Sequence, residues 1–145
     1  MVILDNNILL YATMPRFGQH ARVKHWLEDA LSTGPDVIGI TWQVVTGFVR
    51  VGTNRRIFDR PLDLTFAKQF LTELFGHPMV ATITPAAKHW EVYSKLLEDM
   101  NLTGDIVMDA HIAAIAIENN ASVASTDKDF RRFSDHIKII DPLAK

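Results

Sequence analysis

Short apolar runs alternate with helical patterns along this chain, and that alternation restricts it to an α/β fold. The first run is Val2–Leu4, and later runs of strand length lie at 36–40, 79–82, 123–125 and 137–140. Between the runs, apolar residues recur at helical spacing, with a single helix expected between the first two strands. Strands that alternate with helices predict a central, mostly parallel sheet of four to five strands, flanked by helices.

Length and composition predict one globular domain over residues 1–145. The chain is 48% hydrophobic and contains no Cys, which excludes thiol catalysis and disulfide frameworks. The absence of Cys suits a reducing compartment. The sequence shows neither a signal peptide nor an apolar stretch of membrane-spanning length. We therefore expect a cytoplasmic protein without a membrane partner. The net charge of −2 gives no global nucleic-acid footprint, so RNA binding would need a local patch.

Three aspartates stand where apolar segments end or are interrupted. Asp5 follows the first run, Asp127 follows the run at 122–126, and Asp109 interrupts an apolar helix expected over residues 105–118. Ligands of open α/β sheets bind beyond the carboxyl ends of the strands, and carboxylates gathered there repel one another unless a cation lies between them. Because oxygen ligands favour Mg²⁺ or Mn²⁺ over zinc, the pattern predicts a catalytic site for one of these ions.

Each aspartate also has a purely structural interpretation. Asp5 is well placed to cap the next helix, and Asp127 to cap a short helix after the strand at 123–125. Asp109 is costly inside an apolar helix unless it pairs with a cation or lies exposed in the first turn. Capping and metal binding are compatible, because a carboxylate has two oxygens.

Neighbouring polar residues are candidates for supporting roles. Asp105 lies one helical turn before Asp109 and therefore shares its helix face, which makes it a further catalytic candidate. Asn7, Thr126 and Asp129 are candidates to hydrogen-bond the ligands or a metal-bound water.

A basic cluster follows the helix expected after residue 41. It comprises Arg50, Asn54, Arg55, Arg56 and Arg60. The cluster is either a solvated helix end or a contact surface for RNA phosphates or a protein inhibitor. The aromatic residues nearby, Trp42, Phe48 and Phe58, are expected in the core or in a dimer interface.

At these residues the chain resembles the PIN-domain ribonucleases, and within them the VapC-type toxins of toxin–antitoxin pairs. The resemblance rests on the segments 3–7, 48–56, 109–116 and 126–130, and it runs the whole length. It implies a single PIN-like domain with metal-binding acids at Asp5, Asp109 and Asp127. The family has a further acid where this chain has Gly47, and Asp105 is the candidate substitute.

The resemblance further implies a Mg²⁺- or Mn²⁺-dependent endoribonuclease. Its substrate would be structured RNA such as tRNA or rRNA, a cognate antitoxin would inhibit it, and it would form a homodimer. Two alternatives remain open. One is a PIN-fold binding module weakened by Gly47, and the other is a phospho-acceptor signalling domain. The latter ranks low, because Asn6 and Asn7 stand where it needs paired acids.

Overall fold

A five-stranded parallel sheet forms the centre of the computed structural model, which describes all residues 1–145. Its order is β3-β2-β1-β4-β5, and every neighbouring pair is parallel. The strands are β1 (Val2–Leu4), β2 (Ile38–Thr41), β3 (Val80–Ile83), β4 (Ser122–Ala124) and β5 (Ile139–Ile140). The predicted α/β class and parallel sheet are therefore confirmed.

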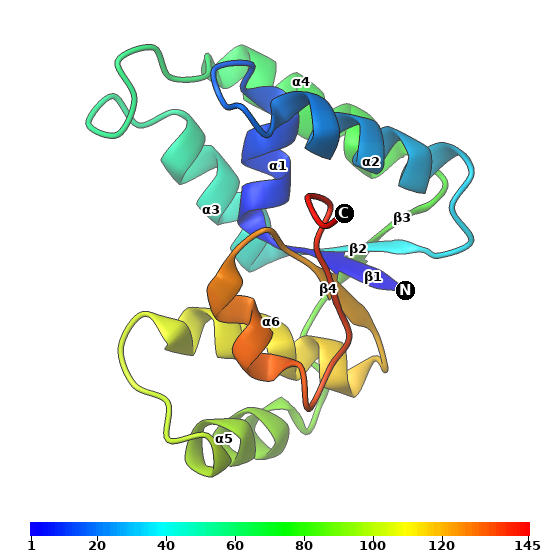
Figure 1. Ribbon diagram of the computed structural model, residues 1–145, viewed down its shortest axis with the longest axis vertical. Helices are drawn as coiled ribbons and strands as arrows, with labels where there is room; N and C mark the ends of the chain where they lie inside the picture. The colour runs from blue at the N-terminus through cyan, green and yellow to red at the C-terminus, as the bar shows by residue number, and fades with distance from the viewer.

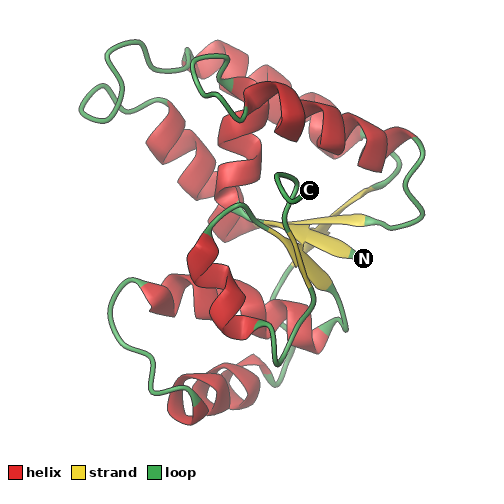
Figure 2. Cartoon of the chain, in the orientation of Figure 1, coloured by secondary structure: helices red, strands yellow, loops and turns green.

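Helices cover both faces of this sheet (Figures 1 and 2). They are α1 (Asn6–Thr13), α2 (His20–Ser32), α3 (Trp42–Gly52), α4 (Leu64–Gly76), α5 (His89–Asp99), α6 (Ile106–Glu118) and the short 3₁₀ helix η1 (Lys128–Phe133). In Figure 1, α1 to α4 lie above the sheet, and α5 and α6 lie below it. No helix combines the length and the apolar character that crossing a membrane requires.

Two helices, α1 and α2, connect β1 to β2, so the expectation of a single helix there is wrong. The first ends at Thr13, and the backbone of the next residue, Met14, is extended (φ −117°, ψ 98°). That conformation is the one favoured before a proline, and Pro15 follows directly. The helix α1 could not be recognised from the sequence, because five of its eight residues are buried and the amphipathic pattern of a surface helix is missing.

The core explains why α6 is apolar on nearly every side. The central strand β1 is buried on both faces, with Ile3 and Leu4 fully enclosed. Helix α6 buries Ala110 and every residue from Ile112 to Ala116, as predicted for a central helix, although it begins at Ile106. The only acid within its first turn is Asp109, which the packing of α6 therefore holds near the sheet.

Candidate active site

The carboxyl ends of two neighbouring strands bring Asp5 and Asp127 to one edge of the sheet. Strands β1 and β4 pair in parallel with Leu4 opposite Ala124, and the backbone N–H of Asp5 donates to the carbonyl of Ala124 (2.9 Å). Asp109 reaches the same edge from α6. These carboxylates share a pocket of about 290 Å³, whose lining comprises Asp5, Asn6, Asn7, Leu10, Gln43, Val44, Gly47, Arg50, Met108, Asp109, Ile112 and Asp127.

Asp5 is the most firmly fixed of the three acids. Its side chain is buried, and one carboxylate oxygen accepts the backbone N–H of Asn6 (2.7 Å) while the other accepts the hydroxyl of Ser125 (2.7 Å). Asp5 therefore caps α1 and lines the pocket at once. Burial raises the pKa of Asp5, the two hydrogen bonds oppose that rise, and the charge of Asp127 adds to it.

Ser125 is a site residue that the sequence reasoning missed. Its Oγ donates to Asp5 and accepts both the backbone N–H of Asp127 (3.0 Å) and the amide of Asn7 (3.4 Å). Asn7 also accepts the backbone N–H of Thr126 through Oδ1 (3.4 Å). The available signal was a small hydroxyl residue between a buried strand and an aspartate, where a hydroxyl can bind both neighbours.

The surroundings of Asp109 also disfavour its charged form. Burial, followed by the negative charges of Asp5, Asp127 and Asp129, raises its pKa to about 7. It lies in the first turn of α6, half-buried, and takes part in none of the ion pairs of the structure. Of its two structural interpretations, the salt bridge is therefore absent and the first-turn position is correct.

Asp127 is both a cap and a pocket residue. Its Oδ1 accepts the backbone N–H of Asp129 (2.9 Å), which starts η1. Thr126 and Asp129 lie outside the pocket lining, although the charge of Asp129 still contributes to the raised pKa of Asp109.

Asp105 does not join the other acids. It precedes α6, is exposed, and lies outside the lining of the pocket. The backbone angles of Asp105 are helical (φ −63°, ψ −32°), so the spacing to Asp109 holds, but its side chain is exposed and lies beyond the pocket.

Helix α3 forms the opposite wall with three residues at successive turns. Gln43 donates to the carbonyl of Met108 (3.1 Å), which ties α3 to the start of α6. Gly47 and Arg50 follow on the same face. Of the predicted basic cluster, Arg50 alone lines the acidic pocket.

The rest of that basic cluster lies in the turn after α3. The exposed Arg55 and Arg56 stand there, and Asn54 accepts the backbone N–H of Arg56 (2.9 Å) through Oδ1, which shapes the turn. Among the nearby aromatic residues, Phe48 is fully buried, as expected of a core residue, whereas Trp42 is 55% exposed.

The donor atoms of the pocket are the kind that a hard divalent cation takes. They are carboxylate and amide oxygens, without His or Cys. No group of three or more His, Cys, Asp or Glu side chains is already arranged to hold a metal ion. Each oxygen of Asp5 accepts one hydrogen bond, which leaves a second lone pair on each for an ion. The donor set fits such an ion in chemistry, and a cation would offset the negative charges of Asp5, Asp127 and Asp129, which add to the effect of burial in raising the pKa of Asp109.

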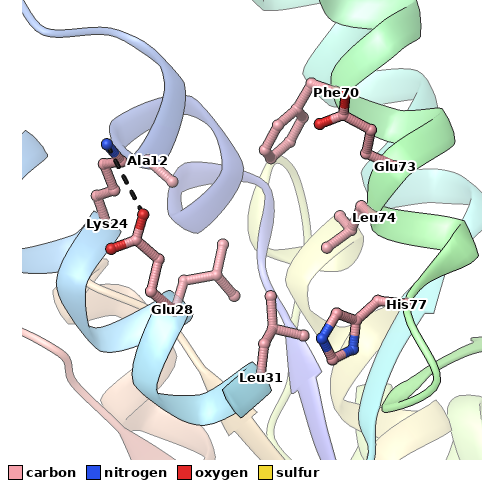
Figure 3. Close-up of a pocket in the computed structure, with 9 residues that line it drawn as sticks. Ala12, Lys24, Glu28, Leu31, Phe70, Glu73, Leu74 and His77 are labelled. Atoms are coloured by element: carbon pink, nitrogen blue, oxygen red, sulfur yellow. Dashed lines mark ion pairs between the residues drawn. The ribbon is translucent and has the colours of Figure 1, made fainter.

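A second, apolar groove lies between α2 and α4, on the upper side of the sheet (Figure 3). It encloses about 240 Å³ and is lined by Ala12, Leu27, Leu31, Phe70 and Leu74, with Lys24, Glu28, Glu73 and His77 around them. Lys24 and Glu28 form an ion pair at its edge (3.7 Å). The groove therefore combines an apolar floor with charged edges.

A parallel α/β domain with an acidic pocket at the carboxyl edge of its sheet is the class of protein that these observations define. The model of the PIN domain family matches residues 2–135, and the chain belongs to that family. Its full-length relatives place it among the VapC proteins of the family.

Two relatives from Mycobacterium tuberculosis illustrate this similarity. The chain is 35% identical to Ribonuclease VapC33 over 143 residues, which cover 99% of each chain. It is 36% identical to Ribonuclease VapC43 over 133 residues, which cover 92% of this chain and 90% of that one. The fold is also that of a chain in VapBC2 from Rickettsia felis bound to a promoter DNA fragment, with a TM-score of 0.68, 22% identity and coverage of 97% and 98%.

Proposed function

We propose that this protein is a divalent-metal-dependent endoribonuclease that hydrolyses phosphodiester bonds in structured RNA such as tRNA or rRNA and is inhibited by a cognate antitoxin. The observation that carries the proposal is the convergence of Asp5, Asp109 and Asp127 in one pocket without a paired cation. The relatives named ribonucleases support the reaction class. Mg²⁺ or Mn²⁺ is the proposed cofactor, because the donors are oxygens.

The proposed mechanism assigns a separate task to each side chain. Asp5, Asp109 and Asp127 would hold the ion, which when bound lowers the pKa of water and stabilises charge on the phosphate. Ser125 fixes Asp5 by donating to Oδ2. Arg50, from the opposite wall, supplies the positive charge that an RNA phosphate needs beside so many acids. Asn54, Arg55 and Arg56 would extend this contact along the RNA or face the antitoxin.

A weakened binding module is the second candidate, and one observation favours it. Gly47 supplies no carboxylate, and the exposed Asp105 does not replace one. The two candidates differ in whether the pocket binds a metal with useful affinity and whether RNA is cut.

Metal binding is expected to stabilise the fold at neutral pH. At free Mn²⁺ of about 100 times its Kd, the free energy of unfolding should rise by about 2.7 kcal/mol. Because the pKa of Asp109 is about 7, protons compete with the ion, and the gain should shrink at pH 5.5. Thermal unfolding with and without Mn²⁺ at the two pH values measures this. An Mn²⁺-independent Tm at pH 8 in the wild type would contradict metal binding.

The apolar groove between α2 and α4 is the proposed docking site for a helical segment of the antitoxin. An amphipathic helix would lay its apolar face on Leu31, Phe70 and Leu74, while its charged residues meet the Lys24 and Glu73 edges. Solved relatives that are toxin–antitoxin complexes support a partner of this kind.

Leu31→Lys is expected to weaken inhibition by the antitoxin without slowing RNA cleavage. A lysine in the apolar floor removes the contact of Leu31 and would have to be desolvated beneath a bound helix, so the concentration for half-inhibition should rise by about 10-fold or more. Titration of the cleavage reaction with the cognate antitoxin measures it. Leu64→Lys is the matched control, because Leu64 is 54% exposed on α4 and lies outside the groove. Equal inhibition of both variants would place the antitoxin elsewhere.

Homodimerisation is part of the proposal, and exposed apolar side chains support it. Trp42 is 55% exposed and Met108 is 58% exposed. The hydrogen bond from Gln43 to the Met108 carbonyl brings the starts of α3 and α6 together, and a second copy of the chain would cover exposed apolar side chains there.

A further inference from the structure

The short 3₁₀ helix η1 carries cations that the proposed mechanism leaves unused. It begins directly after Asp127, one of the pocket acids, and it packs against α6, the helix of Asp109. Two of its basic residues, Lys128 and Arg132, are exposed and form no ion pair in the structure. Unpaired cations at the edge of a pocket for a polyanion are candidates to bind that polyanion.

The spacing of a 3₁₀ helix divides η1 into three faces, because side chains three residues apart are eclipsed. Phe130 and Phe133 form the first face, and both are fully buried in the core. Lys128 and Arg131 form the second face. Arg131 pairs with Asp141 (3.6 Å), which directly follows β5, so this face is directed toward the β5 edge of the sheet.

The third face of η1 carries Asp129 and Arg132, and it lies toward the acidic pocket. The negative charge of Asp129 is among those that raise the pKa of Asp109, which places this face near the first turn of α6. Arg132 follows one 3₁₀ turn later, a rise of about 6 Å along the same face. Its guanidinium is therefore the free cation of η1 that is best placed to serve the pocket.

The order of the sheet puts η1 and α3 on the two sides of the acids. Strand β1 lies between β2 and β4, and α3 follows β2 whereas η1 follows β4. Two strand spacings, about 10 Å, separate the points where these segments leave the sheet. Asp5 follows β1 between them, and Arg50 lines the wall of the pocket that α3 forms. A phosphate backbone that crosses the acids would meet one arginine on each side.

We propose that Arg132 binds a backbone phosphate of the RNA on the η1 side of the acidic pocket, so that the RNA crosses the pocket from Arg50 to Arg132. The inference rests on the proposed function, which it deepens by giving the path of the substrate. A guanidinium suits this position, because its planar fork binds phosphate through two parallel hydrogen bonds and stays protonated. The buried Phe130 and Phe133 anchor η1 and hold Arg132 at a set distance from Asp127.

The affinity for RNA and its dependence on salt test this contact. Binding of fluorescein-labelled unfractionated tRNA is measured by fluorescence polarisation in EDTA at a series of salt concentrations. Arg132→Gln should weaken binding about 3- to 10-fold and reduce the slope of log K against log salt by about 0.7 to 0.9, the share of one phosphate. Arg132→Lys keeps the charge without the fork, so it should keep the slope and lose less affinity.

Matched substitutions separate a directed contact from a general effect of charge. Lys68→Gln removes one exposed positive charge from α4, outside the acidic pocket, and should bind RNA as the wild type does. Lys128→Gln removes an unpaired charge from η1 itself, but from the face directed toward β5, so it should lose less affinity than Arg132→Gln. Thermal unfolding of Arg132→Gln should match the wild type, because the side chain is exposed and unpaired.

Three results would overturn the proposal. Unchanged affinity and slope in Arg132→Gln would leave Arg132 a solvated side chain at the end of η1. An equal loss in Lys128→Gln would show a general effect of charge in place of a directed contact. Unchanged RNA binding together with weakened antitoxin binding would assign Arg132 to the antitoxin.

The behaviour of the unsubstituted η1 separates this inference from the proposed function. If neither the wild type in EDTA nor Asp109→Asn in Mn²⁺ binds RNA, both fail. If RNA is bound but the wild type does not cut it in Mn²⁺, the nuclease fails, and the affinities of the Arg132 variants still decide the contact. If RNA is cut, Arg132→Gln should raise KM and leave kcat nearly unchanged, because the contact is made equally in the ground and transition states.

Discussion

Asp109→Asn is expected to stop RNA cleavage while making the metal-free protein more stable above neutral pH. The substitution keeps the shape of the side chain and removes a proposed metal ligand, so cleavage should fall by more than about 100-fold, beyond the 10- to 100-fold typical of residues that merely support ligands. Cleavage of total RNA in Mn²⁺ by the variant and the wild type measures the loss. Activity within tenfold of the wild type would remove Asp109 from the catalytic set.

The gain in stability follows from the sign of the pKa shift. The folded-state pKa of about 7 lies above the ordinary value of 3.8, so the folded protein binds the proton more tightly than the unfolded chain does. The free energy of unfolding should therefore be highest near pH 4, decline as the pH rises toward 7, and stay low above it. Because Asp109 is half-exposed, we discount the effect for solvent screening to about 1–2 kcal/mol.

Urea unfolding at pH 5 and pH 8, without divalent ions, measures this decline. The wild type should lose stability between the two values, and Asp109→Asn should lose less, because asparagine carries no charge at either pH. An Asn variant less stable than the wild type at pH 8 would mean that the charged carboxylate has a stabilising partner in solution.

Ser125→Ala is expected to disturb the site in a different way, because the serine hydroxyl connects two of its acids. Removing it leaves the buried Asp5 Oδ2 without its donor and the backbone N–H of Asp127 without its acceptor. We expect a loss of about 1–3 kcal/mol in the free energy of unfolding and a 10- to 100-fold loss of cleavage. Urea unfolding and initial cleavage rates are the two measurements.

A pH profile distinguishes this positioning role from simple destabilisation. The hydrogen bond from Ser125 lowers the pKa of Asp5, so its loss should raise that pKa and move the acidic limb of the rate profile to higher pH. Ser122→Ala is the matched control, from the same strand but without a side-chain hydrogen bond to the site. An unshifted acidic limb in Ser125→Ala would show that Asp5 does not depend on this contact.

The sequence predicted the elements that depend on regular patterns. Apolar runs and their order were enough for the parallel sheet, and strand ends were enough to bring Asp5 and Asp127 to one edge. Because Asp109 lies within an apolar helix, the sequence indicated that its carboxylate has a partner, an exposed position or a functional role. All of these follow from hydrophobic periodicity and from the rule for ligand sites in α/β sheets.

Features that depend on contacts distant in sequence were beyond the same reasoning. Ser125 meets Asp5 across 120 positions, so its local sequence indicates a hydroxyl beside Asp127 but not the hydrogen bond to Asp5. The close approach of the Asn6 amide to Gly47 likewise exists only once α1 and α3 pack together. Asp105 was misplaced because helical spacing gives the face on which a side chain lies but not how far the pocket extends along that face. The position of each depends on tertiary packing, which periodicity does not encode.

The central claim is that the acidic pocket is a metal-dependent ribonuclease site. Its most direct test is incubation of mixed tRNA and rRNA with antitoxin-free protein in Mn²⁺, Mg²⁺ or EDTA, beside Asp109→Asn, with the cut ends mapped. We predict cuts at discrete positions in Mn²⁺ or Mg²⁺, none in EDTA and none by the variant. No cutting by the wild type, or identical cuts by the variant, would contradict the nuclease and leave a PIN-fold binding module.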